Sequence, residues 1–127
     1  MDAPRKFPPG GRPLTDEERA LACWPLEHGE SHATSFLPQL ERARVVGGCH
    51  CGCTSIDFTV EGSPPPSGGL RVLGDFLYGT EAEPYGAFIF ERGGVLAGLE
   101  VYGLAGDAPT ALPSPSALRT YDAPTPR

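Results

Sequence analysis

The sequence predicts an α+β domain in which two N-terminal helices pack on a mostly antiparallel sheet of about four strands, a common sheet size. Three observations lead to this fold class. Helical signals are confined to positions 15–43, apolar and polar residues alternate over 54–60, and a Gly93-Gly94 pair separates two apolar segments. Helices followed by strands are typical of a domain whose helices cover one face of a sheet.

The length and the distribution of Gly and Pro suggest a single domain with irregular ends. The chain has 127 residues, within the usual size of one domain. Its 17 glycines and 15 prolines gather at both ends and around 62–69. We therefore expect a flexible arm over 1–13, one α+β domain over 14–113 and an irregular tail over 114–127.

The first helix has a clear start signal. Thr15 and Glu18 stand three residues apart, as in a capping box, in which each side chain bonds the other residue's backbone N–H. Leu21 and Trp24 then share one helical face. Because Pro cannot donate a helical hydrogen bond, we expect this helix to end near Trp24, at Pro25.

A second helix is expected after Thr34 or Ser35. Pro38 would fall in its first turn, where a missing N–H costs little. The apolar residues at helical spacing are Phe36, Leu37, Leu40 and Ala43.

The strands follow. Ile56, Phe58 and Val60 alternate with polar residues, which predicts a strand with one wet face. A Pro- and Gly-rich loop over 62–69 leads to a further strand over 70–78. The last two strands form a hairpin over 86–103, in which Gly93-Gly94 supplies the positive φ angles of a two-residue turn.

The hairpin register is predicted from its apolar residues. If Arg92 faces Val95, a regular ladder gives one apolar face, which a slip of one residue would destroy. The pairs on that face are Phe90 with Ala97, Phe88 with Leu99 and Gly86 with Val101. The residues expected on the other face are Ile89, Glu91, Glu100 and Tyr102.

Three cysteines and a histidine lie within five residues, as Cys49-His50-Cys51-Gly52-Cys53. Thiolate and imidazole groups are the ligands that zinc prefers, so Cys49, Cys51, Cys53 and His50 are candidate metal ligands. In an extended strand, residues i and i+2 are separated by roughly 6.6 Å, whereas two thiolates that bind one zinc ion are roughly 3.8 Å apart. A zinc site therefore needs a bend near Gly52.

Two other interpretations of this run stay open. A disulfide between cysteines two residues apart would be strained and easily reduced, which suits a redox switch. Alternatively, the run is a turn lined by small side chains. Further zinc ligands could come only from Cys23, His28 or His32, although a cysteine on a helix face is usually a small core residue.

Glu100 and Tyr102 are candidate binding residues, because an acid and a phenol would project together from the non-core face of the hairpin. A solvated sheet face would show the same pattern. The sequence contains no Gly-rich phosphate loop, nucleophile elbow or His-Glu metalloprotease motif.

The charge balance argues against nucleic-acid and membrane partners. The net charge is −6, and phosphate contacts need clustered Lys and Arg. No apolar run approaches the roughly 20 residues that span a bilayer. We expect a cytoplasmic protein, where thiols stay reduced.

Two segments resemble those of a group of small uncharacterised bacterial proteins. One contains the Cys-x-Cys-Gly-Cys-x-Ser run at 49–55, and the other is Leu99-Glu100-Val101-Tyr102. The likeness covers residues 15 to about 113, but Thr54 stands where these proteins often have Pro. The resemblance implies a single domain and brings no activity with it.

Three hypotheses of function follow. The first is a non-enzymatic binding or interaction protein with an unknown protein or small-molecule partner. The alternatives are zinc-type metal binding through residues 49–53 and thiol redox chemistry, which requires at least one acidified cysteine.

The zinc hypothesis predicts about one equivalent of metal in protein purified without added metal. Elemental analysis measures it directly, and a content below roughly a tenth of an equivalent contradicts the hypothesis.

Overall fold

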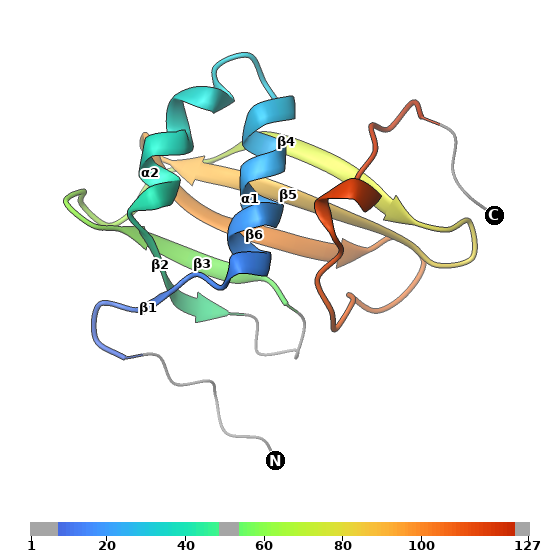
Figure 1. Ribbon diagram of the computed structural model, residues 1–127, viewed down its shortest axis with the longest axis horizontal. Helices are drawn as coiled ribbons and strands as arrows, with labels where there is room; N and C mark the ends of the chain where they lie inside the picture. The colour runs from blue at the N-terminus through green and yellow to red at the C-terminus, as the bar shows by residue number, and fades with distance from the viewer. Residues whose placement is uncertain (1–7, 49–53, 124–127) are drawn as a thin grey trace.

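The computed structural model describes residues 8–48 and 54–123. One antiparallel sheet of six strands forms the body of the domain, in the order β1-β2-β3-β6-β5-β4. Helix α1 (Asp16–His28) lies across one face of this sheet (Figure 1), followed by the short helix α2 (Leu37–Glu41). The strands are β1 (Arg12–Pro13), β2 (Ala43–Gly48), β3 (Ile56–Val60), β4 (Leu70–Gly79), β5 (Pro84–Arg92) and β6 (Val95–Gly103), and the 3-10 turns are η1 (Ala33–Phe36) and η2 (Pro115–Ala117).

The expectation of about four strands is wrong, because the sheet has six. The two additional strands are β1 and β2, which pair with each other at the sheet edge next to β3. Strand β1 has only two residues, too few to show alternation. In β2 a bulge leaves Val46 unpaired and 40% exposed, which breaks the pattern.

Helix α1 continues through Pro25 to His28, so its predicted end at Trp24 is wrong. The reason is tertiary packing. Pro25 is buried against Gly74 of β4, and a side chain at Gly74 would lie 2.7 Å from the Pro25 carbonyl oxygen. Trp24 also stacks on His28, with ring centroids 4.1 Å apart, and meets Phe76 edge to face at 4.7 Å. These contacts offset the cost of proline in the last turn.

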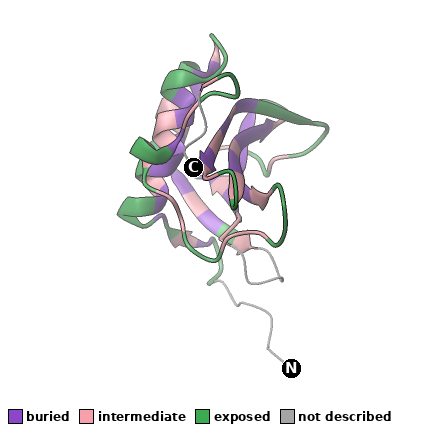
Figure 2. Ribbon diagram, turned by 90° about the vertical axis from the view of Figure 1, so that its right-hand side faces the viewer, coloured by how far each residue is buried: buried purple, intermediate pink, exposed green. Residues whose placement is uncertain are grey.

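The core lies between α1 and the sheet face that it covers, and Figure 2 shows the buried residues concentrated in this layer. The C-terminal segment with η2 lies on the same side of the sheet (Figure 1) and contributes Leu118 to the core. The fully buried large side chains are Leu21, Leu26, Val45, Phe58, Val60, Leu73, Ile89, Leu96, Leu99 and Val101. None of the helices in the described residues is long and apolar enough to cross a membrane.

The hairpin begins as predicted, with Arg92 opposite Val95, but the remaining predicted pairs are wrong. A bulge at Ala97 shifts the register by one residue, so that Phe90 faces Gly98 and Ile89 faces Leu99. Ile89 therefore joins the core, whereas Phe90 and Ala97 are buried outside it.

Because of this shift, the residues of β5 that were predicted to face the core lie on the other face of the sheet. Phe88 now lies opposite Glu100, and Gly86 lies opposite Tyr102. We call the sheet face that carries these residues, turned away from α1, the open face.

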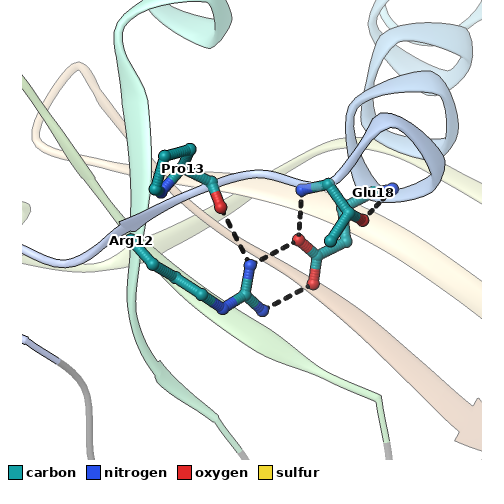
Figure 3. Close-up of polar contacts among 4 residues, drawn as sticks. Arg12, Pro13 and Glu18 are labelled. Atoms are coloured by element: carbon teal, nitrogen blue, oxygen red, sulfur yellow. Dashed lines mark hydrogen bonds and ion pairs between the residues drawn. The ribbon is translucent and has the colours of Figure 1, made fainter.

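An ion pair ties β1 to the start of α1 (Figure 3). Arg12 donates from both Nη atoms to the two carboxylate oxygens of Glu18, at 2.8 and 2.9 Å. The predicted capping box is confirmed, since Thr15 N–H donates to Glu18 Oε1 and Glu18 N–H donates to Thr15 Oγ1. Burial favours the neutral acid, but the hydrogen bonds from Arg12 and Thr15 outweigh it and lower the pKa of Glu18.

We expect Glu18→Gln to lower the free energy of unfolding at pH 7 by about 1–2 kcal/mol, because it removes charged hydrogen bonds at a cap. The pKa of Glu18 lies below its ordinary value of 4.5. Its contribution is therefore present above about pH 4.5 and is lost as the pH falls through the lower folded-state pKa. Urea denaturation from pH 3 to 7 measures both effects.

Glu17→Gln is the matched control, since it makes the same charge change in the same helical turn but at an exposed residue. It should alter stability by less than about 0.5 kcal/mol. Equal losses in the two variants would contradict the role given to Glu18.

Candidate functional site

Three polar side chains from separate segments meet beside the open face: Asp75 of β4, Tyr102 of β6 and Tyr121 of the C-terminal segment. The Tyr102 hydroxyl lies 2.9 Å from Asp75 Oδ1, and the Tyr121 hydroxyl lies 2.9 Å from Asp75 Oδ2. The two phenol oxygens are 2.7 Å apart. We call these three residues the Tyr–Asp–Tyr cluster.

A glycine allows Tyr102 to reach Asp75. Strand β5 separates β6 from β4, so the Tyr102 ring must cross it to reach Asp75. It crosses at Gly86, where an added Cβ would collide with the ring. Phe88 lies beside the tyrosine, with ring centroids 6.0 Å apart. The open face thus carries aromatic surface next to a carboxylate.

The C-terminal segment brings Tyr121 to the cluster. Leu118 is anchored in the core, and Arg119 exchanges two backbone hydrogen bonds with Leu77 on the outer edge of β4, at 2.9 and 2.8 Å. The Arg119 side chain also donates to the Gly79 carbonyl at 3.1 Å. These contacts fix the chain two residues before Tyr121.

An open cavity of about 550 Å³ adjoins the cluster at the outer edge of β4. We call it the edge cavity. Its walls come from the loop after α1, from β4 and from the C-terminal segment. The lining residues are Gly29, Glu30, Ser31, Val72, Gly74, Asp75, Phe76 and Tyr121.

The backbone of Asp75 faces this cavity. In the described part of the chain, β4 has a partner strand on one side only. On the other side, Glu30 N–H donates to the Leu73 carbonyl at 2.9 Å, and Arg119 bonds Leu77. Alternate residues of a strand point their backbone groups the same way, so Asp75 presents its N–H and C=O outward as Leu77 does.

The cluster has three oxygen–oxygen contacts but only two phenolic hydrogens to fill them. The oxygens of this cluster therefore have more lone pairs than the two phenolic hydrogens can fill, and the remaining lone pairs can accept from an outside N–H or O–H donor. Burial raises the pKa of Tyr102 well above its ordinary value, and its bonds to Tyr121 and Asp75 add to this shift. The pKa of Tyr121 is also raised, chiefly by burial. Both phenols therefore remain protonated at neutral pH.

The structure describes none of the four predicted zinc-type ligands. Cys49, His50, Cys51 and Cys53 lie outside the described residues, so the metal and redox hypotheses stay predictions. Within 8–48 and 54–123, no three His, Cys, Asp or Glu side chains are placed to hold a metal ion.

The further candidate ligands have contacts within their own segments. The Cys23 thiol lies 3.5 Å from Glu27 Oε1, and burial first, then this carboxylate, raises the pKa of Cys23. His28 Nδ1 donates to the Trp24 carbonyl oxygen at 2.9 Å. His32 is half-buried in the loop that follows α1.

Of the two candidate binding residues, the structure brings only Tyr102 into the cluster. Glu100 lies on the same face, two residues earlier on β6, but it is exposed and does not line the edge cavity. Asp75 and Tyr121 were not singled out from the sequence. An acid inside the apolar 70–78 segment was the one available signal for Asp75, and Tyr121 fell in the expected irregular tail.

No protein-family model, curated protein or solved structure matches the chain. The contacts of the site are therefore the basis for assigning its chemistry.

We expect Tyr102→Phe to lower the free energy of unfolding at pH 7 by about 1–2 kcal/mol, because it leaves Asp75 with one phenol partner. In the wild type, the pKa of Tyr102 is raised above the ordinary value of 10.0. The stabilising contribution of the Tyr102 hydroxyl is therefore present below about pH 10 and is lost as the pH rises further. The variant should therefore lose less stability than the wild type between pH 8 and 10.5, as measured by urea denaturation.

Tyr85→Phe serves as the control, since the Tyr85 hydroxyl donates to Glu83 at the surface, 3.0 Å away. This hydrogen bond also raises the pKa of Tyr85, but water screens a surface contact, so the variant should keep a pH dependence closer to that of the wild type than Tyr102→Phe does. Identical curves for the two variants would rule out the role given to Tyr102.

Proposed function

We propose that this protein is a non-catalytic binding protein and that the edge cavity holds a cationic group of its ligand, an ammonium or a guanidinium. The observation that carries this proposal is the acidic lining of the cavity. Asp75 and Glu30 supply carboxylates, Tyr121 supplies a phenol oxygen, and none of the described lining residues is basic.

The hydrogen-bond balance of the cluster favours the same ligand class. An ammonium group brings three N–H donors and a guanidinium brings five, which matches a site with more oxygens than hydrogens. A charge-assisted bond to a partly buried carboxylate contributes about 1.5–3 kcal/mol. The net charge of −6 also attracts cations to the protein.

The open face adds an apolar surface beside the cation site. Phe88 and Tyr102 lie next to each other there, and Val72 is 37% exposed at the rim of the edge cavity. A ligand with an apolar body and a cationic end would contact both parts. Protonated phenols and a paired carboxylate bind such a group without a nucleophile, which supports binding rather than catalysis.

The test is a titration with n-butylamine, which is an ammonium ion at pH 7, followed by protein amide NMR shifts in about 150 mM salt to suppress non-specific attraction. We expect a dissociation constant on the order of 1–10 mM, as for one small polar group. The shifts should centre on Glu30, Val72, Asp75 and Tyr121. Asp75→Asn should weaken binding at least about fivefold, which corresponds to about 1 kcal/mol.

Glu100→Gln is the matched control, because it removes one negative charge from the same sheet face outside the cavity. It should change the affinity by less than about twofold, as expected of an exposed charge. The neutral isostere n-butanol should bind more weakly than the amine. Equal binding of the alcohol, or equal weakening by Asp75→Asn and Glu100→Gln, would contradict the proposal.

A further inference from the structure

The outer edge of β4 already binds two segments of its own chain through backbone hydrogen bonds. The Leu73 carbonyl accepts from Glu30 N–H at 2.9 Å. Four residues further, Leu77 exchanges both of its outward bonds with Arg119, as an isolated antiparallel bridge. The edge between these points is accessible from the edge cavity, and Asp75 lies at its centre.

The C-terminal segment leaves the edge before it reaches Asp75. An antiparallel partner that places Arg119 opposite Leu77 would place Tyr121 opposite Asp75. The chain turns at 121–122 instead, and the Tyr121 hydroxyl bonds Asp75 Oδ2 with its side chain alone. Up to residue 123, no backbone hydrogen bond from this segment reaches the outward N–H and C=O of Asp75, which face the cavity.

Resting on the function proposed above, we infer that the ligand is a peptide with a free amino terminus whose first residues lie extended along this edge. Its α-ammonium group binds the carboxylates of Asp75 and Glu30. Its backbone exchanges two hydrogen bonds with Asp75, as Arg119 does with Leu77 two residues away. This is strand addition combined with capture of an N-terminal amine.

The dimensions favour a chain end over a continuous strand. The span from Leu73 to Leu77 is four residues, roughly 13 Å in an extended strand. A longer strand would meet the Glu30 backbone at one end or Arg119 at the other. A peptide terminus fits between them, and the rest of the peptide leaves toward solvent.

The charges select the amino end of the peptide. Two carboxylates line the cavity, so a C-terminal carboxylate would be repelled whereas an ammonium group is attracted. An exposed Val72 beside the edge offers an apolar contact to one of the first side chains.

The experiment compares three probes by NMR titration of the full chain: the peptide Ala-Val-Ala-amide, its N-acetylated form, and n-butylamine. We expect the free peptide to bind at least about tenfold more tightly than the amine, because backbone bonds add to the ammonium contact. Acetylation of the amino terminus should weaken binding of the peptide by a similar factor. The Asp75 N–H should also exchange more slowly with deuterium when the free peptide is bound.

One variant tests the contribution of the Glu30 carboxylate separately from that of the Glu30 backbone. Glu30→Gln keeps the backbone N–H that bonds Leu73 and should weaken the free peptide about threefold or more. Glu81→Gln, an exposed acid in the turn after β4, is its control and should have no such effect.

The outcomes distinguish this inference from the proposed function. Amine binding with no gain for the peptide, or equal binding of the acetylated and free peptides, overturns the inference and leaves the cation site standing. Failure of both the amine and the free peptide to bind overturns both. Tighter peptide binding without slower exchange at Asp75 refutes the edge pairing.

Discussion

The register of β5 against its two neighbours determines which side chains of the sheet face the helices. A bulge at Leu73 interrupts β4, and a bulge at Ala97 interrupts β6, and both lie level with Ile89 to Glu91 of β5. Bulges bend a strand and strengthen its twist. Because each one also exchanges the two faces of a strand, these two positions decide which side chains of three strands meet α1.

The bulge at Leu73 also determines how the helix packs. It buries Leu73 completely and places Gly74 beneath Pro25, where no larger residue fits. The Leu73 carbonyl also accepts a hydrogen bond from Glu30 N–H, which connects the loop after α1 to β4. One irregularity thus orients the end of α1 and forms a wall of the edge cavity.

The candidate site combines elements that are far apart in the sequence. Strand β4 supplies Asp75, the end of β6 supplies Tyr102, and the last described segment supplies Tyr121. Gly86 matters as much as the polar residues, since its missing side chain is what lets Tyr102 span β5. The proposed binding role needs no rearrangement of this site, because the phenols are protonated and the backbone groups at the edge of β4 face the cavity.

Local features could be predicted from the sequence: the capping box of Thr15 and Glu18, the alternation of β3, and the two-residue turn at Gly93-Gly94. Each depends on residues close together in the chain. Contacts between distant segments determine the continuation of α1 through Pro25, the pairing of β1 with β2 and the bulge at Ala97. They also bring Asp75 and Tyr121 together. In these cases a contact with a distant segment outweighs the local preference. At the Ala97 bulge, burying Ile89 and Leu99 on one face stabilises the fold more than a regular ladder would.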